Sequence, residues 1–302
     1  MKHQNPSHPV CDGISNQGIF GIAYDGISRT QFEPRTVFSA YVAQLGLNNV
    51  ISFRGCSATS TSPSFVDFGN QNDALSCITN QSPLGWATII AESYYVVDVV
   101  GVAVSGIPVA IPPVWQQDYG GSIVDSCTTL LVLPSAIYTA FTTAIVNSNV
   151  LQNAGMSNAM VNSFVFGFTG IYAAYFPINF AALPTISFTL DSPTTGTITL
   201  TLSGYNYIQP DGSGYLFFPI GTGGSSIMFG GVFFEEYYIV FDRMNKRIGF
   251  GPGCDCGLPS MAGKIATVSL GTGVSKYLKK SSVTNVCSRH LALLMVFGFC
   301  IL

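Results

Sequence analysis

The sequence predicts an all-β protein, and three observations support this class. Charged residues make up only 9 % of the 302 residues, against about 25 % in a typical globular protein. The chain contains 32 Gly, 22 Phe and 14 Tyr, and together with many Ser, Thr and β-branched residues these favour strands and tight turns. The hydrophobic share of 48 % is enough for a sizeable core, which excludes a disordered tail or linker.

Five segments carry strand signals. Residues 186–190 and 197–202 alternate apolar and polar side chains with period two on either side of a turn, which predicts a hairpin. A second hairpin is predicted from residues 237–241 and 248–250, with a polar turn between them. Residues 94–104 are rich in valine and predict one longer strand.

Two segments carry the periodicity of helices. Residues 36–45 place apolar side chains at i, i+4 and i+8 and are followed by Gly46, a stop signal. Residues 135–145 follow Pro134 and carry a similar stripe. The apolar stripes are Val37, Tyr41 and Leu45 in the first helix, and Ile137, Phe141, Ala144 and Ile145 in the second.

Composition also argues against several classes of function. A net charge of −3 provides no basic surface for nucleic acid. The cysteines include no Cys-x-x-Cys pair, and the three histidines (His3, His8 and His290) lie near the termini, so we expect no metal and no cofactor. Serine or cysteine nucleophiles lack their usual histidine base in the body of the chain, and no glycine-rich phosphate-binding motif is present.

One carboxylate stands apart from the others. Asp125 follows the hydrophobic run 122–124, lies in a turn with Ser126, Cys127 and Thr128, and is followed by a second hydrophobic run. The hydroxyl and amide groups of such a turn can hydrogen-bond an ionised carboxylate and hold it charged. Asp125 is therefore the candidate for chemistry.

The other acids fit structural roles. Glu235 and Glu236 are interpreted as solvated residues at the start of a strand, and Asp242 as a residue of the second hairpin. The structural alternative for Asp125 is an acid that is only satisfied by the hydroxyls of its turn.

The run Ile-Val-Asp-Ser-Cys-Thr-Thr-Leu-Leu at residues 123–131 resembles the second active-site loop of the pepsin-like aspartic endopeptidases, peptidase family A1. Further blocks resemble segments of this family, in the same order: residues 18–28, 94–104, 227–243 and 248–250. The resemblance covers residues 14 to about 253, which is most of the chain.

This resemblance implies a pepsin-like fold and hydrolysis of peptide bonds by a pair of carboxyl groups. It assigns Asp125 as a catalytic residue and Ser126, Cys127 and Thr128 as the supporting loop. The implied partner is a polypeptide substrate or peptide ligand, and no metal or cofactor is implied.

The sequence departs from the family pattern in two places. The first active-site loop and its flap precede, in the family, the segment that begins here near Ile14, and the upstream residues contain Asp12 but not that motif. The loop glycine is replaced by Cys127, whose side chain is expected to crowd the position of a partner carboxylate. Peptide hydrolysis needs two carboxyl groups that share one proton, so we expect this chain to be an incomplete or inactive form.

Three interpretations therefore stay open. The first is an aspartic endopeptidase whose sequence is truncated, with the missing half upstream. The second is a non-catalytic pseudo-protease that acts as a peptide-binding or interaction module, which Cys127 favours. The third is self-association of two chains across their Asp125 loops, with one acid from each.

The resemblance also suggests an organisation into parts. We expect residues 1–85 to be a remnant of the first lobe and of the strands between the lobes, and residues 86–253 to be a nearly complete second lobe. Residues 254–290 are interpreted as a linker, because periodicity fades there into Gly, Ser and Lys.

The last segment, residues 291–302, is an uninterrupted apolar run. It is shorter than the roughly 20 residues that a spanning helix needs. It follows small residues at 281–282 and a polar spacer, which is the layout of a glycolipid-anchor signal; a docked C-terminal helix is the alternative. No signal peptide is visible in residues 1–10. We expect an extracellular or secretory-pathway protein, with membrane attachment through this tail.

Overall fold

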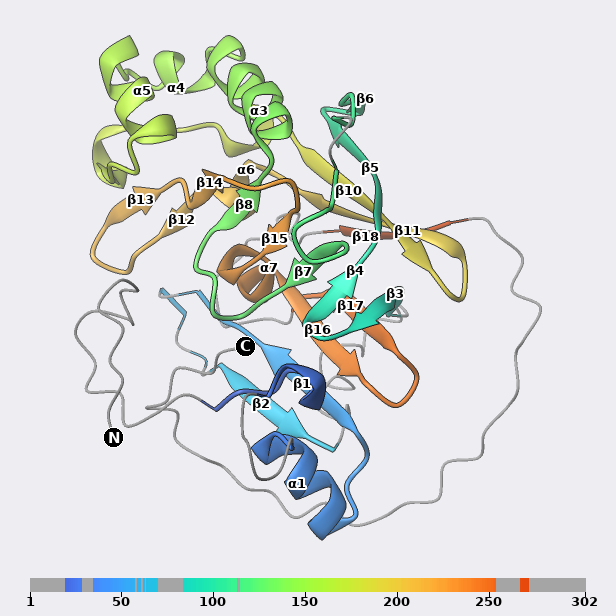
Figure 1. Ribbon diagram of the computed structural model, residues 1–302. Coiled ribbons are helices and arrows are strands. Elements are labelled where there is room, and N and C mark those ends of the chain that lie inside the picture. The colour runs from blue at the N-terminus through green and yellow to red at the C-terminus, as the bar shows by residue number, and fades with distance from the viewer. Residues whose placement is uncertain are drawn as a thin grey trace, which may run out of the picture.

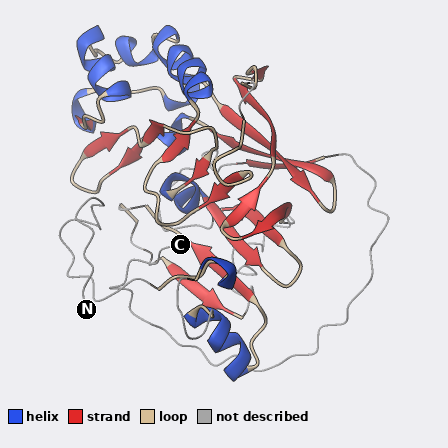
Figure 2. Ribbon diagram, in the orientation of Figure 1, coloured by secondary structure: helices blue, strands red, loops and turns tan. Residues whose placement is uncertain are grey.

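Strands dominate the computed structural model, which describes residues 20–28, 35–57, 59–60, 62, 64–69, 84–112, 115–253 and 267–271. Over these residues the strands form three sheets, and several of the helices gather at one end of the molecule (Figure 2). The predicted all-β class is confirmed.

The largest sheet has ten strands in the order β14-β8-β15-β7-β4-β3-β17-β16-β1-β2. In chain order these strands are β1 (Val50–Arg54), β2 (Phe65–Phe68), β3 (Gly85–Glu92), β4 (Tyr95–Val97), β7 (Ser122–Val124), β8 (Leu131–Leu133), β14 (Ile220–Thr222), β15 (Met228–Phe229), β16 (Tyr237–Asp242) and β17 (Arg247–Pro252). All six residues of β16 are buried. Since β1 pairs antiparallel with β16, segments far apart in sequence share one continuous sheet.

Two smaller sheets complete the β structure. The five-stranded sheet has the order β18-β11-β10-β5-β6 and the three-stranded sheet the order β12-β13-β9. Their strands are β5 (Val99–Val104), β6 (Ile107–Pro108), β10 (Ile186–Ser192), β11 (Gly196–Leu202), β18 (Thr267–Leu270), β9 (Ile171–Tyr172), β12 (Gln209–Pro210) and β13 (Tyr215–Phe217). The predicted β10–β11 hairpin is confirmed, with Ile186 opposite Leu202.

The helices lie mainly at two ends of the molecule. Figure 1 shows α3, α4 and α5 together at one end and α1 beside β1 and β2 at the other. The α-helices are α1 (Val37–Leu45), α3 (Ser135–Asn147), α4 (Val150–Asn153), α5 (Asn158–Phe166), α6 (Gly204–Tyr207) and α7 (Gly231–Glu236). Short 3-10 helices are η1 (Asp25–Ile27), η2 (Ala173–Tyr175) and η3 (Phe180–Ala182).

Both predicted helices form where the sequence places them. In α3 the predicted stripe faces the core, since Ile137, Phe141 and Ile145 are buried. Helix α1 begins after Thr36, whose side chain accepts a hydrogen bond from the amide of Ser39, and it ends at Gly46 with φ of 63°.

The apolar stripe of α1 has the opposite orientation from that of α3. Val37, Tyr41 and Leu45 are 54 %, 48 % and 62 % exposed, whereas Phe38 is the buried residue of this helix. The ring of Phe38 lies 5.8 Å from that of Phe68 at the sheet edge. The periodicity located the helix but did not identify the side that packs on the sheet.

The predicted strand over residues 94–104 is divided in two, which corrects that prediction. β4 belongs to the ten-stranded sheet and β5 to the five-stranded sheet, and Asp98 lies between them. The side chain of Gln116 holds this break, because its Nε2 donates to Asp98 Oδ1 at 2.7 Å and its Oε1 accepts from the Val99 amide at 2.9 Å. The chain therefore changes sheets at Asp98.

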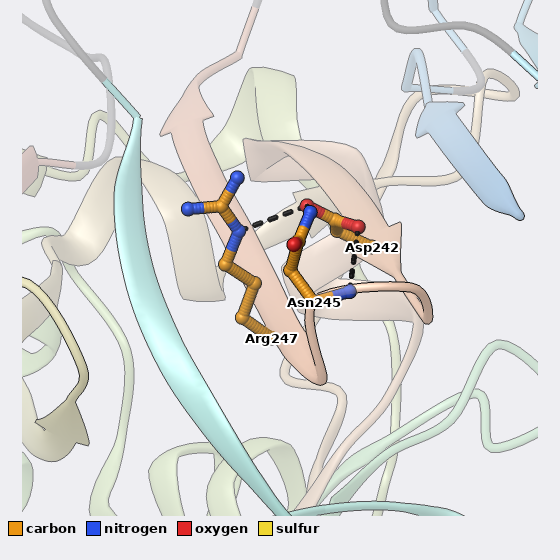
Figure 3. A network of polar contacts seen from close by, with 3 residues as sticks. All are labelled: Asp242, Asn245 and Arg247. Carbon is orange, nitrogen blue, oxygen red and sulfur yellow. Dashed lines mark hydrogen bonds and ion pairs between the residues drawn. The ribbon is translucent and has the colours of Figure 1, made fainter. Parts of the chain in front are cut away.

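The second predicted hairpin, β16–β17, is confirmed, and Asp242 closes it (Figure 3). Asp242 Oδ2 accepts hydrogen bonds at 2.8 Å from Arg247 Nε and from Asn245 Nδ2. Asp242 Oδ1 accepts from the amide of Asn245 at 3.1 Å. One buried carboxylate thus fixes both the turn and the cation beside it.

Two other predictions about segments are corrected. Glu235 and Glu236 do lie directly before strand β16, as predicted, but they end helix α7 and are partly buried, so the prediction that they are solvated is wrong. Residues 267–270, assigned to a linker, form β18 and pair with β11. The remainder of the predicted linker, except Gly271, and the apolar tail lie outside the described residues. The predicted division of the chain into lobes stays a prediction.

Candidate active-site loop

The turn that contains Asp125 is positioned by three short strands. β7 leads into the turn and β8 leaves it, while β15 lies between them, parallel to β7 and antiparallel to β8. The amide of Asp125 donates to the carbonyl oxygen of Phe229, the last residue of β15, at 3.1 Å. Because all three residues of β7 are buried, the acid stands at the end of a fixed core strand.

The carboxylate of Asp125 is held by its own turn. The side chain is only 5 % exposed. Its Oδ1 accepts from the amide of Cys127 at 2.9 Å, and its Oδ2 accepts from Thr128 Oγ1 at 2.6 Å. The hydroxyl and amide contacts expected from the sequence are therefore present.

Burial nevertheless has the largest effect on the pKa of Asp125. Removal of the carboxylate from water raises its pKa above the ordinary value of 3.8, and this effect exceeds the lowering by the hydrogen bonds from Thr128 and Cys127. The hydrogen bonds of the turn favour the charged form of Asp125, as expected from the sequence, but burial outweighs them and the net shift of the pKa is upward. Within the described part of the chain, no second carboxyl group contacts Asp125 or contributes to this shift.

Two glycines that follow β15 pack against the backbone of the turn. Gly230 follows β15, and a Cβ atom added there would lie 2.2 Å from the carbonyl oxygens of both Thr128 and Leu130. The amide of Gly231 donates to Thr128 O at 2.7 Å. The residues after β15 therefore pack directly against the backbone of the loop, and a side chain has no room at Gly230.

The remaining members of the predicted loop are more exposed than the acid. Ser126, Cys127 and Thr128 are all partly exposed. Cys127 takes part in a disulfide bond, as does Cys56. The sulfur of Cys127, in the turn that contains Asp125, is therefore covalently bonded.

Tyr119 is a neighbour of this loop that the sequence analysis missed. Burial raises its pKa, and the charges of Tyr94, Asp118 and Asp125 raise it further. Its ring packs edge-on against Tyr94, with 5.3 Å between ring centres. In the sequence, Tyr119 is set apart only by its place shortly before β7, and this position alone does not indicate a residue near Asp125.

Thr128→Val should raise the pKa of the Asp125 carboxyl further, because the substitution removes the 2.6 Å hydrogen bond to Oδ2. It should also cost about 1 kcal/mol of stability where Asp125 is ionised. A carbon-13 NMR titration of the Asp125 carboxyl measures the shift. Thr129→Val is the matched control, since Thr129 is exposed; equal pKa values in the two variants would contradict this role of Thr128.

Within the described residues, no group of three or more His, Cys, Asp or Glu side chains is arranged to hold a metal ion. The chemistry that Asp125 itself offers is proton transfer. A carboxyl group whose pKa is raised by burial can donate a proton when protonated and accept one when ionised.

Comparison with known proteins places this loop in a family. Residues 94–252 match the family described as Xylanase inhibitor C-terminal. Pepsin A of Gallus gallus is 27 % identical over 241 residues, which cover 78 % of this chain and 55 % of that protein. Beta-secretase of Strongylocentrotus purpuratus is 24 % identical over 256 residues, which cover 78 % of this chain and 47 % of that protein.

A plant relative, the protein ASPARTIC PROTEASE IN GUARD CELL 2 of Arabidopsis thaliana, is 30 % identical over 185 residues, covering 56 % of this chain and 36 % of that protein. The chain spans about half the length, or less, of the curated relatives it matches. The family match alone covers more than half of the chain. The chain therefore belongs to the pepsin-like aspartic protease family, and residues 94–252 correspond to the C-terminal part of that family's fold.

Proposed function

We propose that the Asp125 loop is one half of an aspartic peptidase active site, which hydrolyses peptide bonds once a second carboxyl group is supplied. One observation carries this proposal. The carboxylate of Asp125 is buried at the end of β7 and held by the amide of Cys127 and the hydroxyl of Thr128, in a chain that belongs to the pepsin-like family.

The chemistry of such a site depends on two acids. One carboxylate removes a proton from water, and the other carboxyl donates a proton to the scissile carbonyl. Each general acid or base contributes a factor of about 10²–10⁴ in rate. The raised pKa of Asp125 suits the member of the pair that carries the proton.

We expect the 302-residue chain by itself to give no turnover, because its described residues bring no second carboxyl to Asp125. The purified chain should be incubated with an unfolded protein at pH 3 to 6, beside Asp125→Asn. Peptide release should equal the buffer background in both samples. Cleavage by the wild type that Asp125→Asn abolishes would show that the second acid comes from this chain or from a second copy of it.

The hypothesis that Asp125 belongs to half of a longer active site is tested by sequencing the transcript upstream of Met1. An Asp-Thr/Ser-Gly loop and a flap encoded there would supply the second acid, and the extended protein should then cleave with Asp125 required. A stop codon without such a loop would remove the incomplete-chain interpretation. Sedimentation of the existing chain tests the remaining source, a second copy; a monomer at working concentration would end it.

A non-catalytic role is the second candidate, and Cys127 favours it. Disulfide-bonded Cys127 stands where the family uses glycine, and the matched family is described by the name of an inhibitor. A peptide-binding module of this kind should bind an unfolded polypeptide without cleaving it. Peptide release that requires Asp125 would contradict this role.

The disulfide bonds of Cys56 and Cys127 support a place in the secretory pathway or outside the cell, since disulfides persist in oxidising compartments. Within the described residues, we find no helix with the length and apolarity needed to cross a bilayer. Attachment through the apolar tail stays part of the proposal, because the tail lies outside those residues.

A further inference from the structure

A second candidate site lies away from the Asp125 loop, where η1 and α1 approach the turn after β16. A pocket of about 520 Å³ opens there, and its wall includes Tyr24, Asp25, Arg35, Ser39, Glu92 and Arg243. None of the residues that line it belongs to the Asp125 loop. Its size falls within the range of sites for small ligands.

Arg243 is the buried cation of this pocket. It is 5 % exposed, and its Nε and Nη1 atoms are buried without a hydrogen-bond partner. Nη2 makes one long hydrogen bond, 3.4 Å, to Ser39 Oγ. The guanidinium lies 4.6 Å from the ring centre of Tyr24 and 5.3 Å from that of Phe38. Buried polar groups in folded proteins are nearly always paired, so we expect the Nε and Nη1 groups of Arg243 to have a hydrogen-bond acceptor that the described residues do not supply.

The two acids on the same wall do not provide that acceptor. Asp25 Oδ1 already accepts from the amide and hydroxyl of Thr36 at 2.8 and 3.0 Å, and from Ser39 Oγ at 2.7 Å. Glu92 pairs with Lys246 at 2.5 Å. Neither acid forms an ion pair with Arg243 among the described residues, although the charge of Arg243 is among the influences that lower the pKa of Asp25.

We propose that this pocket binds a carboxylate group, which accepts hydrogen bonds from the unpartnered N–H groups of Arg243 and from the hydroxyl of Tyr24. The Tyr24 hydroxyl is also buried, with the Arg243 guanidinium as its polar neighbour. Burial raises the pKa of Tyr24 to about 12 although Arg243 lowers it, so the hydroxyl remains a donor. Guanidinium groups match the planar carboxylate well. Arg35 gives the wall a second cation, while Asp25 and Glu92 disfavour a more highly charged anion such as phosphate.

The carboxylate can belong to a small molecule or to an acidic side chain of a polypeptide, and titration of the full chain separates the two. Sodium glutarate represents the first source, and acetyl-Ala-Glu-Ala-amide represents the second, with its Gln counterpart as the blank. Calorimetric titrations at pH 7 and constant ionic strength, with sodium chloride as the control titrant, should show saturable binding of at least one probe. Tighter binding of the Glu peptide than of glutarate identifies a polypeptide source.

Arg243→Gln should weaken this binding at least tenfold. Arg54→Gln is the matched control, because Arg54 also lies against an aromatic ring, 5.2 Å from Phe65, but does not line the pocket. If Arg243→Gln does not fold, the nitrogen-15 signal of Arg243 Nε in the wild type gives the answer, since it should shift on titration while that of Arg54 stays fixed. No saturable binding of either probe, or equal binding by folded Arg243→Gln, would overturn the proposal.

Discussion

Gly230→Ala should destabilise the protein by about 4 kcal/mol or prevent folding, because the new side chain has no space. A Cβ at this position lies 2.2 Å from the carbonyl oxygens of Thr128 and Leu130. Both oxygens belong to the backbone of the Asp125 loop, so no side-chain rotation relieves the clash. Folded cores are packed too densely to absorb such an overlap locally.

The loop also cannot move away freely. Gly231 is tied to Thr128 O by a 2.7 Å hydrogen bond, and Asp125 is tied to Phe229 O at 3.1 Å. Relief of the clash must therefore break contacts that hold the Asp125 turn against β15. Urea denaturation followed by circular dichroism measures the loss of stability, and the pKa of Asp125 in any folded fraction reports whether the turn has shifted.

Gly223→Ala is the matched control for Gly230→Ala. Gly223 follows β14, and a Cβ there meets only Val132 Cγ1 at 3.6 Å, an ordinary van der Waals contact. We expect a change of at most about 1 kcal/mol for this variant. Equal stabilities of the two variants would contradict the close packing of Gly230 under the loop.

Local pattern predicted those parts of the fold that depend on neighbours in sequence. The β10–β11 and β16–β17 hairpins follow from alternating side chains and turn residues. The Asp125 turn follows from hydroxyl residues between two hydrophobic runs. In each case the contacts that define the element lie within a few residues of it.

Contacts between distant segments account for what the sequence did not predict. The break at Asp98 depends on Gln116, and the buried side of α1 depends on Phe68 at the sheet edge. Tyr119 comes near Asp125 because of the order of the strands, and β18 has no clear strand signal because it is largely exposed on a sheet edge. These features depend on tertiary partners that one sequence does not identify.

The two acids at the end of α7, Glu235 and Glu236, should make the stability of the protein depend strongly on pH, because burial makes their charged forms unfavourable. Burial raises the pKa of Glu236 to about 8, an effect reduced by the hydrogen bond from Asn206 and increased by the charge of Glu235. Burial raises the pKa of Glu235 to about 7. Asn206 Nδ2 donates to Glu236 Oε2 at 2.6 Å, so protonation of Glu236 leaves this contact in place.

The stability of the wild type should therefore fall as the pH rises from about 4.5 to about 8. In this window the unfolded chain releases the Glu236 proton, whose ordinary pKa is 4.5, while the folded chain still holds it. A state that binds more protons loses stability as the pH increases. Below this window Glu236 is protonated in both the folded and the unfolded chain. Above it, Glu236 is ionised in both, and the loss of stability is complete. Glu235 acts in the same direction, up to about pH 7.

Glu236→Gln should remove most of this loss. A glutamine side chain can still accept the hydrogen bond from Asn206, but it carries no charge to bury. We expect the variant to be more stable than the wild type by about 2–4 kcal/mol at pH 9, and nearly equal to it at pH 4, since a pKa shift of one unit corresponds to about 1.4 kcal/mol and the partial exposure of Glu236 reduces the full value. Urea denaturation at pH values from 4 to 9 measures the difference.

Glu92→Gln, at an exposed acid paired with Lys246, is the control and should change stability by less than about 1 kcal/mol at every pH. A stability difference for Glu236→Gln that does not grow between pH 4 and pH 9 would show that Glu236 is ionised at low cost in the folded protein, and that its carboxylate is solvated at the end of α7 after all.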